Sequence, residues 1–229
     1  MINIALVGSG RISYKHFESL INLNKFFNIR AICDVDQQNL KNTVKLISQL
    51  TSEQNFKKPQ FDLFNEYDFL ISEIKSKKID IDLIILCTPS GYHPSQAKKA
   101  AEIGVNVCTE KPLATNLEDG LELLKIFKNN DKKLFVVLQN RLNPTIKLLK
   151  KQIDSGRFGK IFMVTSNVFW QRPQTYYDIS SWRGTKKLDG GAMLNQSSHY
   201  VDLMCFLPNL KVKKISAFAN TLGRDIEME

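Results

Sequence analysis

Residues 2–13, Ile-Asn-Ile-Ala-Leu-Val-Gly-Ser-Gly-Arg-Ile-Ser, decide the fold of this 229-residue chain. An apolar run ends at Gly8, and a segment whose apolar residues have helical spacing begins at Arg11. A strand, a glycine-rich turn and a helix, in this order, form the context that a dinucleotide fingerprint requires. Gly8 permits the tight turn and Gly10 lets the backbone approach a pyrophosphate, which the helix start at Arg11 and Ile12 can bind.

A carboxylate follows the second apolar run, residues 29–33. Asp34 lies 24 positions after Gly10, where it can accept hydrogen bonds from both ribose hydroxyls and would repel a 2′-phosphate. This residue therefore predicts NAD rather than NADP. The third position of the glycine pattern is Ser13, which is small enough for close packing of helix on strand. The alternative is a plain strand–turn–helix that binds no ligand.

The first 140 residues alternate between short apolar runs and segments with helical spacing. Strands are expected near residues 2–8, 29–33, 81–87, 105–108 and 133–138, with helices near 11–23, 39–50, 95–103 and 117–129. Such alternation predicts an α/β fold with a parallel, doubly wound sheet and right-handed crossovers. The polar residues 51–60 are expected to form a loop or a small insertion within the sheet domain.

The pattern changes after about residue 140. One helix is expected at 145–155, followed by β-rich segments at 160–170 and 211–219 that suggest a mostly antiparallel open sheet. We therefore divide the chain into domains 1–140 and 141–229. The first has 18 basic and 16 acidic residues, whereas the second has 14 and 7.

Composition excludes several protein classes. With 43% hydrophobic and 24% charged residues the chain is neither disordered nor a disulfide framework. It shows no membrane-spanning apolar run and no signal peptide, so a cytoplasmic location without a membrane partner is expected. The net charge of +9 raises the question of nucleic acid, but the basic residues are scattered and no nucleic-acid-binding motif is present. The four cysteines are expected to be buried thiols, and no metal site is expected.

Polar residues follow the expected strand 81–87. Ligands of open parallel sheets bind outside the carboxyl ends of the strands, so these residues are candidates for cofactor contacts. They are Thr88, Pro89, Ser90 and His93. For His93 the alternative is a helix-start residue that faces solvent.

Two charged residues follow the strand 105–108. Lys111 would lie beside the nucleotide cleft, where its ammonium can orient a substrate hydroxyl or lower its pKa. The neighbouring Glu110 is a candidate for a cofactor contact. The alternative is a surface Glu–Lys pair.

A polar stripe marks a later helix, which Gly190 and Gly191 open. Asn195, His199 and Asp202 lie at i, i+4 and i+7 on one helix face. His199 can accept a proton from an alcohol, and Asp202 could orient its ring. The alternative is a satisfied buried His–Asp pair.

Together, and in this order, these motifs resemble the Gfo/Idh/MocA family of NAD(P)-dependent sugar oxidoreductases. The resemblance implies an N-terminal Rossmann domain and a C-terminal α/β domain with a large open sheet that often forms a dimer or tetramer interface. The chain is shorter than typical members. We therefore expect an incomplete sheet with an unpaired edge and an exposed apolar face.

One branch of the family fits best. Asn195-Gln196 before the histidine, residues 139–144 and residues 182–185 look like the UDP-N-acetyl-2-amino-2-deoxyglucuronate dehydrogenases of bacterial surface-polysaccharide synthesis, which oxidise the sugar 3-hydroxyl. The resemblance implies Lys111 and His199 as catalytic residues. It adds Gln139 to the cofactor contacts, and the substrate contacts that it implies are Lys111, Arg141, Tyr177, Asp178, Arg183, Asn195 and His199. Alternatives are another sugar or inositol dehydrogenase of the family and a non-catalytic protein that binds NAD or a sugar.

Overall fold

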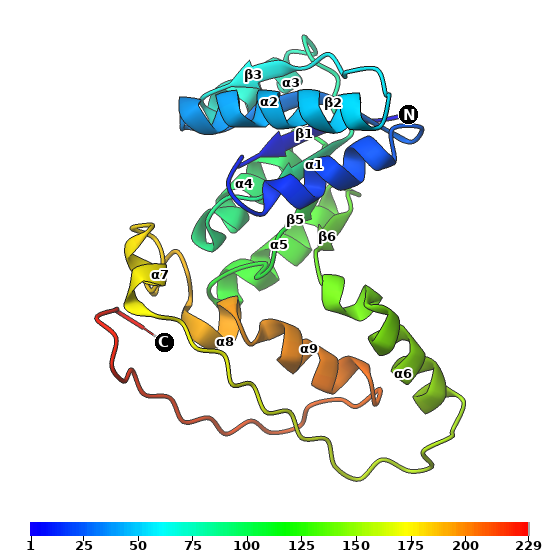
Figure 1. The fold of residues 1–229 in the computed structure, drawn as a ribbon, viewed down its shortest axis with the longest axis vertical. Helices are drawn as coiled ribbons and strands as arrows, with labels where there is room; N and C mark the ends of the chain where they lie inside the picture. The colour runs from blue at the N-terminus through cyan, green and yellow to red at the C-terminus, as the bar shows by residue number, and fades with distance from the viewer. Residues whose placement is uncertain (229) are drawn as a thin grey trace. The chain divides into compact units, whose positions relative to one another are not determined.

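The computed structural model describes residues 1–228. The chain forms two compact units, Met1–Val136 and a second that begins at Val137 (Figure 1). Within the described residues, no helix combines the length and the apolar character that crossing a membrane requires.

The first unit is built on a six-stranded sheet in which every neighbouring pair of strands is parallel. The strand order β3-β2-β1-β4-β5-β6 reverses direction between β1 and β4. This order confirms the predicted doubly wound α/β sheet, with its switch point at the carboxyl ends of β1 and β4. The strands are β1 Ile2–Val7, β2 Phe27–Cys33, β3 Asp62–Phe64, β4 Leu83–Leu86, β5 Asn106–Thr109 and β6 Leu134–Val136.

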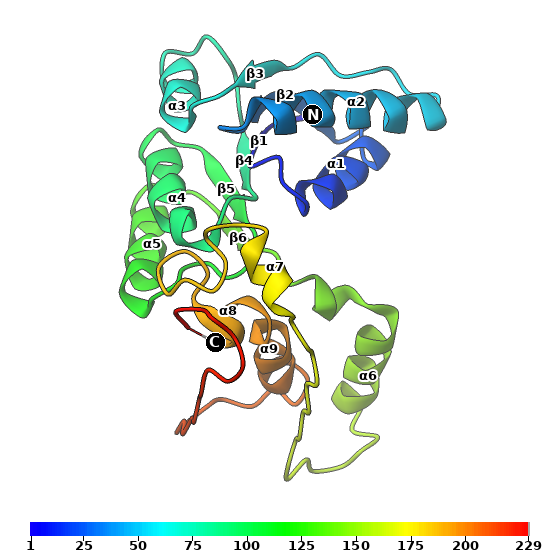
Figure 2. The same cartoon turned by 60° about the vertical axis from the view of Figure 1, so that its left-hand side comes forward.

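Helices cover both faces of this sheet (Figure 2). One core cluster joins apolar residues of α1 and α2 to Ile4 and Leu6 of β1, and the other joins α3, α4 and α5 to Ala5 and Val7. Successive β1 side chains thus enter opposite cores, which explains the continuous apolar runs of these buried strands. The helices are α1 Ser13–Asn22, α2 Gln37–Glu53, α3 Tyr67–Lys75, α4 His93–Glu102 and α5 Leu117–Asn129, with a short 3-10 helix η1 at Ser90–Tyr92.

Helix α2 continues into residues that the sequence predicts as a loop. It ends at Glu53, and Thr51 is buried with its hydroxyl donating 2.8 Å to the carbonyl of Ile47. The polar composition of this segment concealed the helical turn, because a threonine can satisfy its hydroxyl against the helix backbone.

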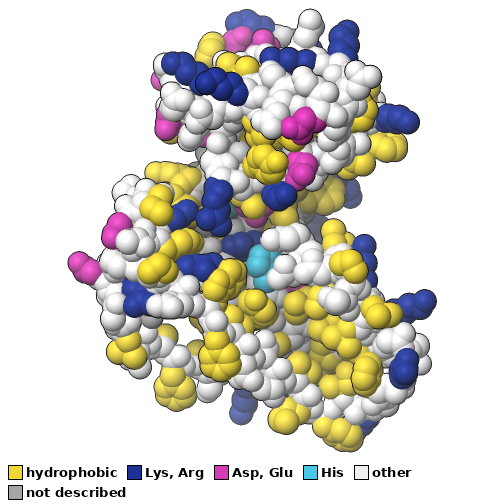
Figure 3. All heavy atoms as spheres, in the orientation of Figure 1, with side chains coloured by type: hydrophobic (Ala, Val, Ile, Leu, Met, Phe, Trp, Pro, Cys, Tyr) yellow, Lys and Arg dark blue, Asp and Glu magenta, His cyan; other side chains and the backbone are white. Residues whose placement is uncertain are grey.

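The second unit contains four α-helices and the 3-10 helix η2 among its described residues. They are η2 Gln139–Leu142, α6 Pro144–Asp154, α7 Gln174–Asp178, α8 Gly191–Asn195 and α9 Ser198–Phe206. Hydrophobic side chains gather on the surface over α6 and α9 (Figure 3), where Leu148 is 61% and Val201 45% exposed.

The strands expected at residues 160–170 and 211–219 are not formed in the described part of this unit. Both segments lack regular secondary structure, and their apolar side chains are open to solvent, such as Phe169 at 96% and Phe218 at 100% exposure. A β-rich sequence forms a strand only when a neighbouring strand satisfies its backbone and a packed layer covers its apolar face. Among residues 137–228 neither condition is met.

The turn after β1 depends on one glycine. Gly8 has a φ of +90°, and a β-carbon there would lie 2.7 Å from the carbonyl carbon of Cys87. A β-carbon on Gly10, in contrast, would point into open space. The two glycines therefore have different roles: Gly8 lets β1 pass the end of β4, and Gly10 keeps the turn accessible.

The first prediction compares these two glycines. Gly8→Ala should lower the free energy of unfolding by about 2 kcal/mol or more, because the left-handed backbone and the backbone overlap both oppose a β-carbon. Gly10→Ala should change it by less than about 0.5 kcal/mol. Urea unfolding followed by circular dichroism measures both, and equal effects would contradict the assignment.

Candidate functional site

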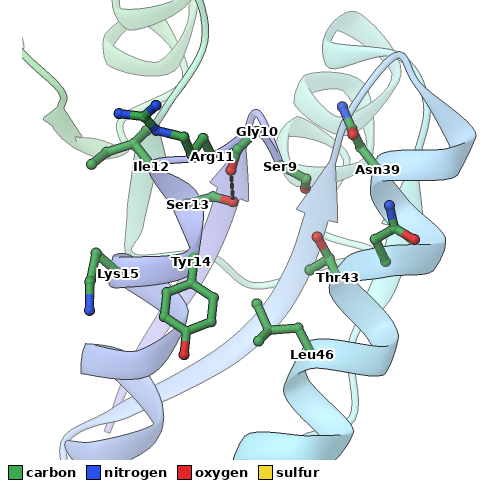
Figure 4. Close-up of a pocket in the computed structure, with 11 residues that line it drawn as sticks. Ser9, Gly10, Arg11, Ile12, Ser13, Tyr14, Lys15, Asn39, Thr43 and Leu46 are labelled. Carbon is green, nitrogen blue, oxygen red and sulfur yellow. Dashed lines mark hydrogen bonds between the residues drawn. The ribbon is translucent and has the colours of Figure 1, made fainter.

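The glycine-rich turn borders an open cavity of about 720 Å³ (Figure 4). Figure 4 shows Thr43 and Leu46 of α2 facing Tyr14 of α1 across it. Of the predicted cofactor residues, Gly10, Arg11 and Ile12 line this cavity, and Gly8 lies behind them against Cys87. The full lining is Ser9, Gly10, Arg11, Ile12, Ser13, Tyr14, Lys15, Asn39, Asn42, Thr43 and Leu46.

The donors at this turn suit a diphosphate. No side chain among the described residues caps the N-terminus of α1, where the positive end of the helix dipole favours an anion. The backbone N–H groups of Ser13 and Lys15 donate at 3.1 Å to the carbonyls of Gly10 and Ile12. The buried hydroxyl of Ser9 has no hydrogen-bond partner within residues 1–228, and buried hydroxyls are rarely left so. An unpaired hydroxyl beside a helix N-terminus is an arrangement that a pyrophosphate would complete.

Asp34 lies beside this turn, held from both sides. The backbone N–H of Ser9 donates to Oδ2 at 2.5 Å and that of Asp36 to Oδ1 at 2.8 Å. The Asn39 amide nitrogen lies 3.5 Å from both oxygens. An ionised carboxylate has about four acceptor positions. The two backbone N–H groups occupy one on each oxygen, and the two hydroxyls of a ribose would replace the long 3.5 Å contacts with Asn39.

The first residues after β4, Thr88 to Ser90, are partly or fully buried. The Thr88 hydroxyl donates to Gln96 Oε1 at 2.6 Å, Pro89 directly precedes η1, and Ser90 is 6% exposed. These contacts fix the loop, and a contact of the loop with a cofactor stays a prediction.

His93 is 1% exposed, which excludes the solvent-facing alternative. Its Nδ1 lies 2.8 Å from the carbonyl oxygen of Pro112 and its Nε2 2.9 Å from that of Thr88. A neutral ring can donate to only one of them at a time. Burial lowers the pKa of His93 below its ordinary value, because the charged ring would lose its hydration.

Glu110 is 7% exposed and so is not part of a surface pair. Its Oε1 lies 2.8 Å from Nε2 of His16, and the backbone N–H of Lys111 donates to Oε2 at 3.3 Å. The sequence did not single out His16, because its position in α1 matched the periodicity of core residues. Only the distance between α1 and the end of β5 reveals this pair.

In the second unit the predicted polar helix is divided in two. Helix α8 ends at Asn195 and α9 begins at Ser198. The N–H groups of Gln196 and Ser197 both bond to the carbonyl of Ala192, at 2.9 and 2.7 Å. The first bond has the four-residue spacing of an α-helix, whereas the Ser197 bond spans five residues and interrupts that spacing. Asn195 and His199 therefore do not share one continuous helix face.

His199 is 8% exposed, and its Nε2 lies 3.4 Å from the amide nitrogen of Gln139. The structure thus brings together two residues that the sequence assigned to the site. Asp202 pairs with Arg141, whose Nε donates to Oδ2 at 2.7 Å and whose Nη2 donates to Oδ1. This guanidinium partner of Asp202 was not foreseen, and orientation of His199 by Asp202 stays a prediction.

A buried carboxylate fixes Asn195. Asp189, 3% exposed, accepts from the Asn195 side-chain amide and from the backbone N–H of Gly184 at 2.8 Å. The residues around α8 and the loop 182–185 are therefore tied to one carboxylate. Asp189 directly precedes the two glycines that open the predicted helix, but the sequence gave it no role.

Two arginines stack on Tyr176. The guanidinium carbon of Arg183 lies 4.3 Å from the centre of this ring and that of Arg172 lies 4.9 Å from it. Arg183 also donates to the Tyr176 carbonyl at 2.8 Å. Of the other predicted substrate residues nearby in sequence, Tyr177 is buried and Asp178 exposed. Arg172 was missed because no motif pointed to it.

Family models match both parts of the chain. The description of the first is "Oxidoreductase family, NAD-binding Rossmann fold" and it matches residues 2–138. The second, "GFO/IDH/MocA C-terminal domain", matches residues 146–229.

Solved structures resemble the chain over its whole length. The WlbA dehydrogenase from Chromobacterium violaceum, in complex with NADH and UDP-GlcNAcA, is 41% identical with a TM-score of 0.83. The WlbA dehydrogenase from Bordetella pertussis, with the same two ligands, is 39% identical with a TM-score of 0.83. Both cover 100% of this chain, and the chain covers 61% and 63% of them.

A curated relative is more distant. Inositol 2-dehydrogenase from Rhizobium meliloti is 29% identical over 145 residues, which are 62% of this chain and 41% of the relative. The chain therefore spans less than two thirds of the length of these relatives.

The burial of His93 gives the second prediction. At pH values below 6.5, the ordinary pKa of histidine, His93 binds a proton in the unfolded chain. In the folded chain it binds one less readily, because its pKa is lowered. The free energy of unfolding should therefore fall as the pH is lowered from about 7 to about 5. In His93→Gln, which cannot titrate, the fall should be smaller. Urea unfolding at each pH tests this, and equal falls would contradict it.

Proposed function

Because the chain belongs to the Gfo/Idh/MocA oxidoreductase family, we propose that it oxidises the 3-hydroxyl of a UDP-N-acetylglucosaminuronic acid-type sugar to a ketone. The observation that carries this proposal is the 41% identity, over the whole chain, with a dehydrogenase solved with NADH and UDP-GlcNAcA. The product would serve the synthesis of lipopolysaccharide or O-antigen precursors in the cytoplasm.

The first domain, residues 1–140, is proposed to bind NAD. The α1 N-terminus and Ser9 would hold the pyrophosphate, and Asp34 the adenosine ribose. Bound there, NAD⁺ would supply a hydride acceptor at the nicotinamide ring. The cofactor contacts proposed further along the chain are Thr88, Pro89, Ser90, His93, Glu110, Lys111 and Gln139.

Lys111 and His199 are proposed to handle the proton of the sugar hydroxyl. His199 takes this proton as general base, since a neutral imidazole can accept it near neutral pH. Lys111 orients the same oxygen and stabilises the negative charge that develops on it. Gln139, 3.4 Å from His199 Nε2, would help to hold the ring.

The second domain, residues 141–229, is proposed to bind the sugar acid and its diphosphate. Arg141 and Arg183 are the cationic candidates, and Asn195, Tyr177 and Asp178 the polar ones. A guanidinium has five N–H donors. In Arg141, one N–H of Nε and one of Nη2 donate to Asp202. The exposed apolar surface over α6 and α9 supports a homo-oligomer, a dimer or a tetramer.

The second candidate function is oxidation of another sugar or of inositol. The match with inositol 2-dehydrogenase favours it. A non-catalytic protein that binds NAD or a sugar is the third reading. The first function yields NADH from a UDP-sugar, the second from another sugar or inositol, and the third from no substrate. One assay of NADH formation therefore separates them.

The third prediction is that the protein forms NADH from UDP-N-acetylglucosaminuronic acid. The absorbance of NADH is measured with and without 2-oxoglutarate. His199→Ala and Lys111→Ala should each lose most turnover while their affinity for NADH stays within about threefold, because neither residue supplies the main pyrophosphate or ribose contacts. An exposed lysine variant, Lys125→Ala, is the control. Absence of both NADH and 3-keto product in either condition would refute this substrate, and free sugars and inositols would then be screened.

The fourth prediction concerns cofactor choice. Asp34→Ser removes the carboxylate that would bind the ribose, so affinity for NADH should fall by about tenfold while affinity for NADPH rises. Fluorescence titration measures both constants. Asp62→Ser, at an exposed carboxylate of β3, should leave both unchanged. An unaltered preference in Asp34→Ser would contradict the assignment.

A further inference from the structure

A partly buried histidine–carboxylate pair links two elements that are distant in sequence. His16 belongs to the second turn of α1 and Glu110 follows β5, and their side chains are 16% and 9% exposed. The 2.8 Å contact joins the helix after β1 to the end of β5, and β4 lies between these two strands in the sheet. The proposed function uses Glu110 but assigns nothing to His16.

The pair fixes the carboxylate of Glu110. One oxygen contacts His16 and the other accepts from the backbone N–H of Lys111. The backbone N–H of Glu110 donates 2.9 Å to the carbonyl of Leu86 at the end of β4. Losing the donor to Oε1 would leave a buried carboxylate oxygen without that partner, which is costly enough to make the segment rearrange.

The residue on the other side of Lys111 is also held by a histidine. The ring of His93 lies 2.8 Å from the carbonyl oxygen of Pro112 and 2.9 Å from that of Thr88. The backbone of Lys111 therefore runs between two anchored neighbours, Glu110 and Pro112. Because both neighbours are held, the position of the Lys111 α-carbon is fixed. This matters because a catalytic group must be positioned within a fraction of an ångström.

The other end of the link is the glycine-rich turn. His16 follows the residues of α1 that line the cavity, Ile12 to Lys15. A shift of this helix would be transmitted through the His16–Glu110 contact to Lys111. The turn that would hold the pyrophosphate is thus linked to the backbone of Lys111 through helix α1 and the contacts of Glu110 with His16 and with the Lys111 N–H.

We infer that His16 is a positioning residue for Lys111, acting through Glu110. This inference rests on the proposed role of Lys111. His16 touches neither substrate nor cofactor in this scheme. It fixes the segment from which Lys111 extends, relative to the helix that begins the dinucleotide site.

The fifth prediction uses a pair of variants. His16→Leu keeps side-chain bulk but removes the donor, whereas His16→Gln keeps an N–H at similar reach. In His16→Leu, kcat should fall by about 10- to 100-fold, the effect of misplacing a catalytic group by about 1 Å, while affinity for NADH changes by less than about threefold. His16→Gln should recover most of kcat. Lys98→Leu, which removes the exposed 2.8 Å pair with Glu122, is the matched control and should leave kcat unchanged.

A second readout needs no turnover. Acetylation of Lys111 by a water-soluble N-hydroxysuccinimide ester can be timed by peptide mass spectrometry in the full chain. The rate at Lys111, relative to other lysines, should rise at least about threefold in His16→Leu because the segment loosens, and return toward the wild-type rate in His16→Gln. Should His16→Leu fail to fold, His16→Asn replaces it, since its amide is too short to reach Glu110.

The two readouts separate this inference from the proposed function. If wild-type protein oxidises no sugar, the proposed function fails and the acetylation rates alone decide the role of His16. Wild-type kcat and an unchanged Lys111 rate in His16→Leu would overturn the inference. Equal losses in the Leu and Gln variants would overturn it too, because that result indicates a steric role without the hydrogen bond.

Discussion

The close approach of Gly8 to the end of β4 is the constraint on which the rest of the structure depends. Parallel pairing brings β1 and β4 together, and a β-carbon on Gly8 would lie 2.7 to 2.8 Å from the backbone of Cys87 and Thr88. With no side chain there, the chain can turn at once into α1. The helix N-terminus, Ser9 and Asp34 then converge at one edge of the sheet.

Much of the first unit follows from periodicity. The apolar runs gave five of the expected strands because strands buried on both faces need apolar side chains at every position. The short strand β3, Asp62–Phe64, escaped notice, since two of its three residues are exposed and carry no such signal. The glycine turn and Asp34 were predictable because their roles are local: one backbone conformation and one charge at a strand end.

Tertiary contacts were not predictable in this way. His16 contacts Glu110 across 94 positions and Arg141 contacts Asp202 across 61, and neither spacing follows from a local pattern. The division between α8 and α9 also escaped the helical spacing, because backbone hydrogen bonds to Ala192 end the first helix regardless of which side chains follow. For the segments 160–170 and 211–219 the sequence instead predicted strands that do not form. Their β-rich residues express a preference that only neighbouring strands could realise.

The choice of a histidine as the partner of Glu110 has an electrostatic consequence. An arginine or lysine at position 16 would neutralise the buried carboxylate and add a permanent positive charge close to Lys111. A histidine can donate a hydrogen bond while uncharged, so Glu110 can be satisfied and still keep its negative charge next to the lysine backbone. The hydrogen bond therefore fixes the geometry of the segment without a permanent cation at position 16.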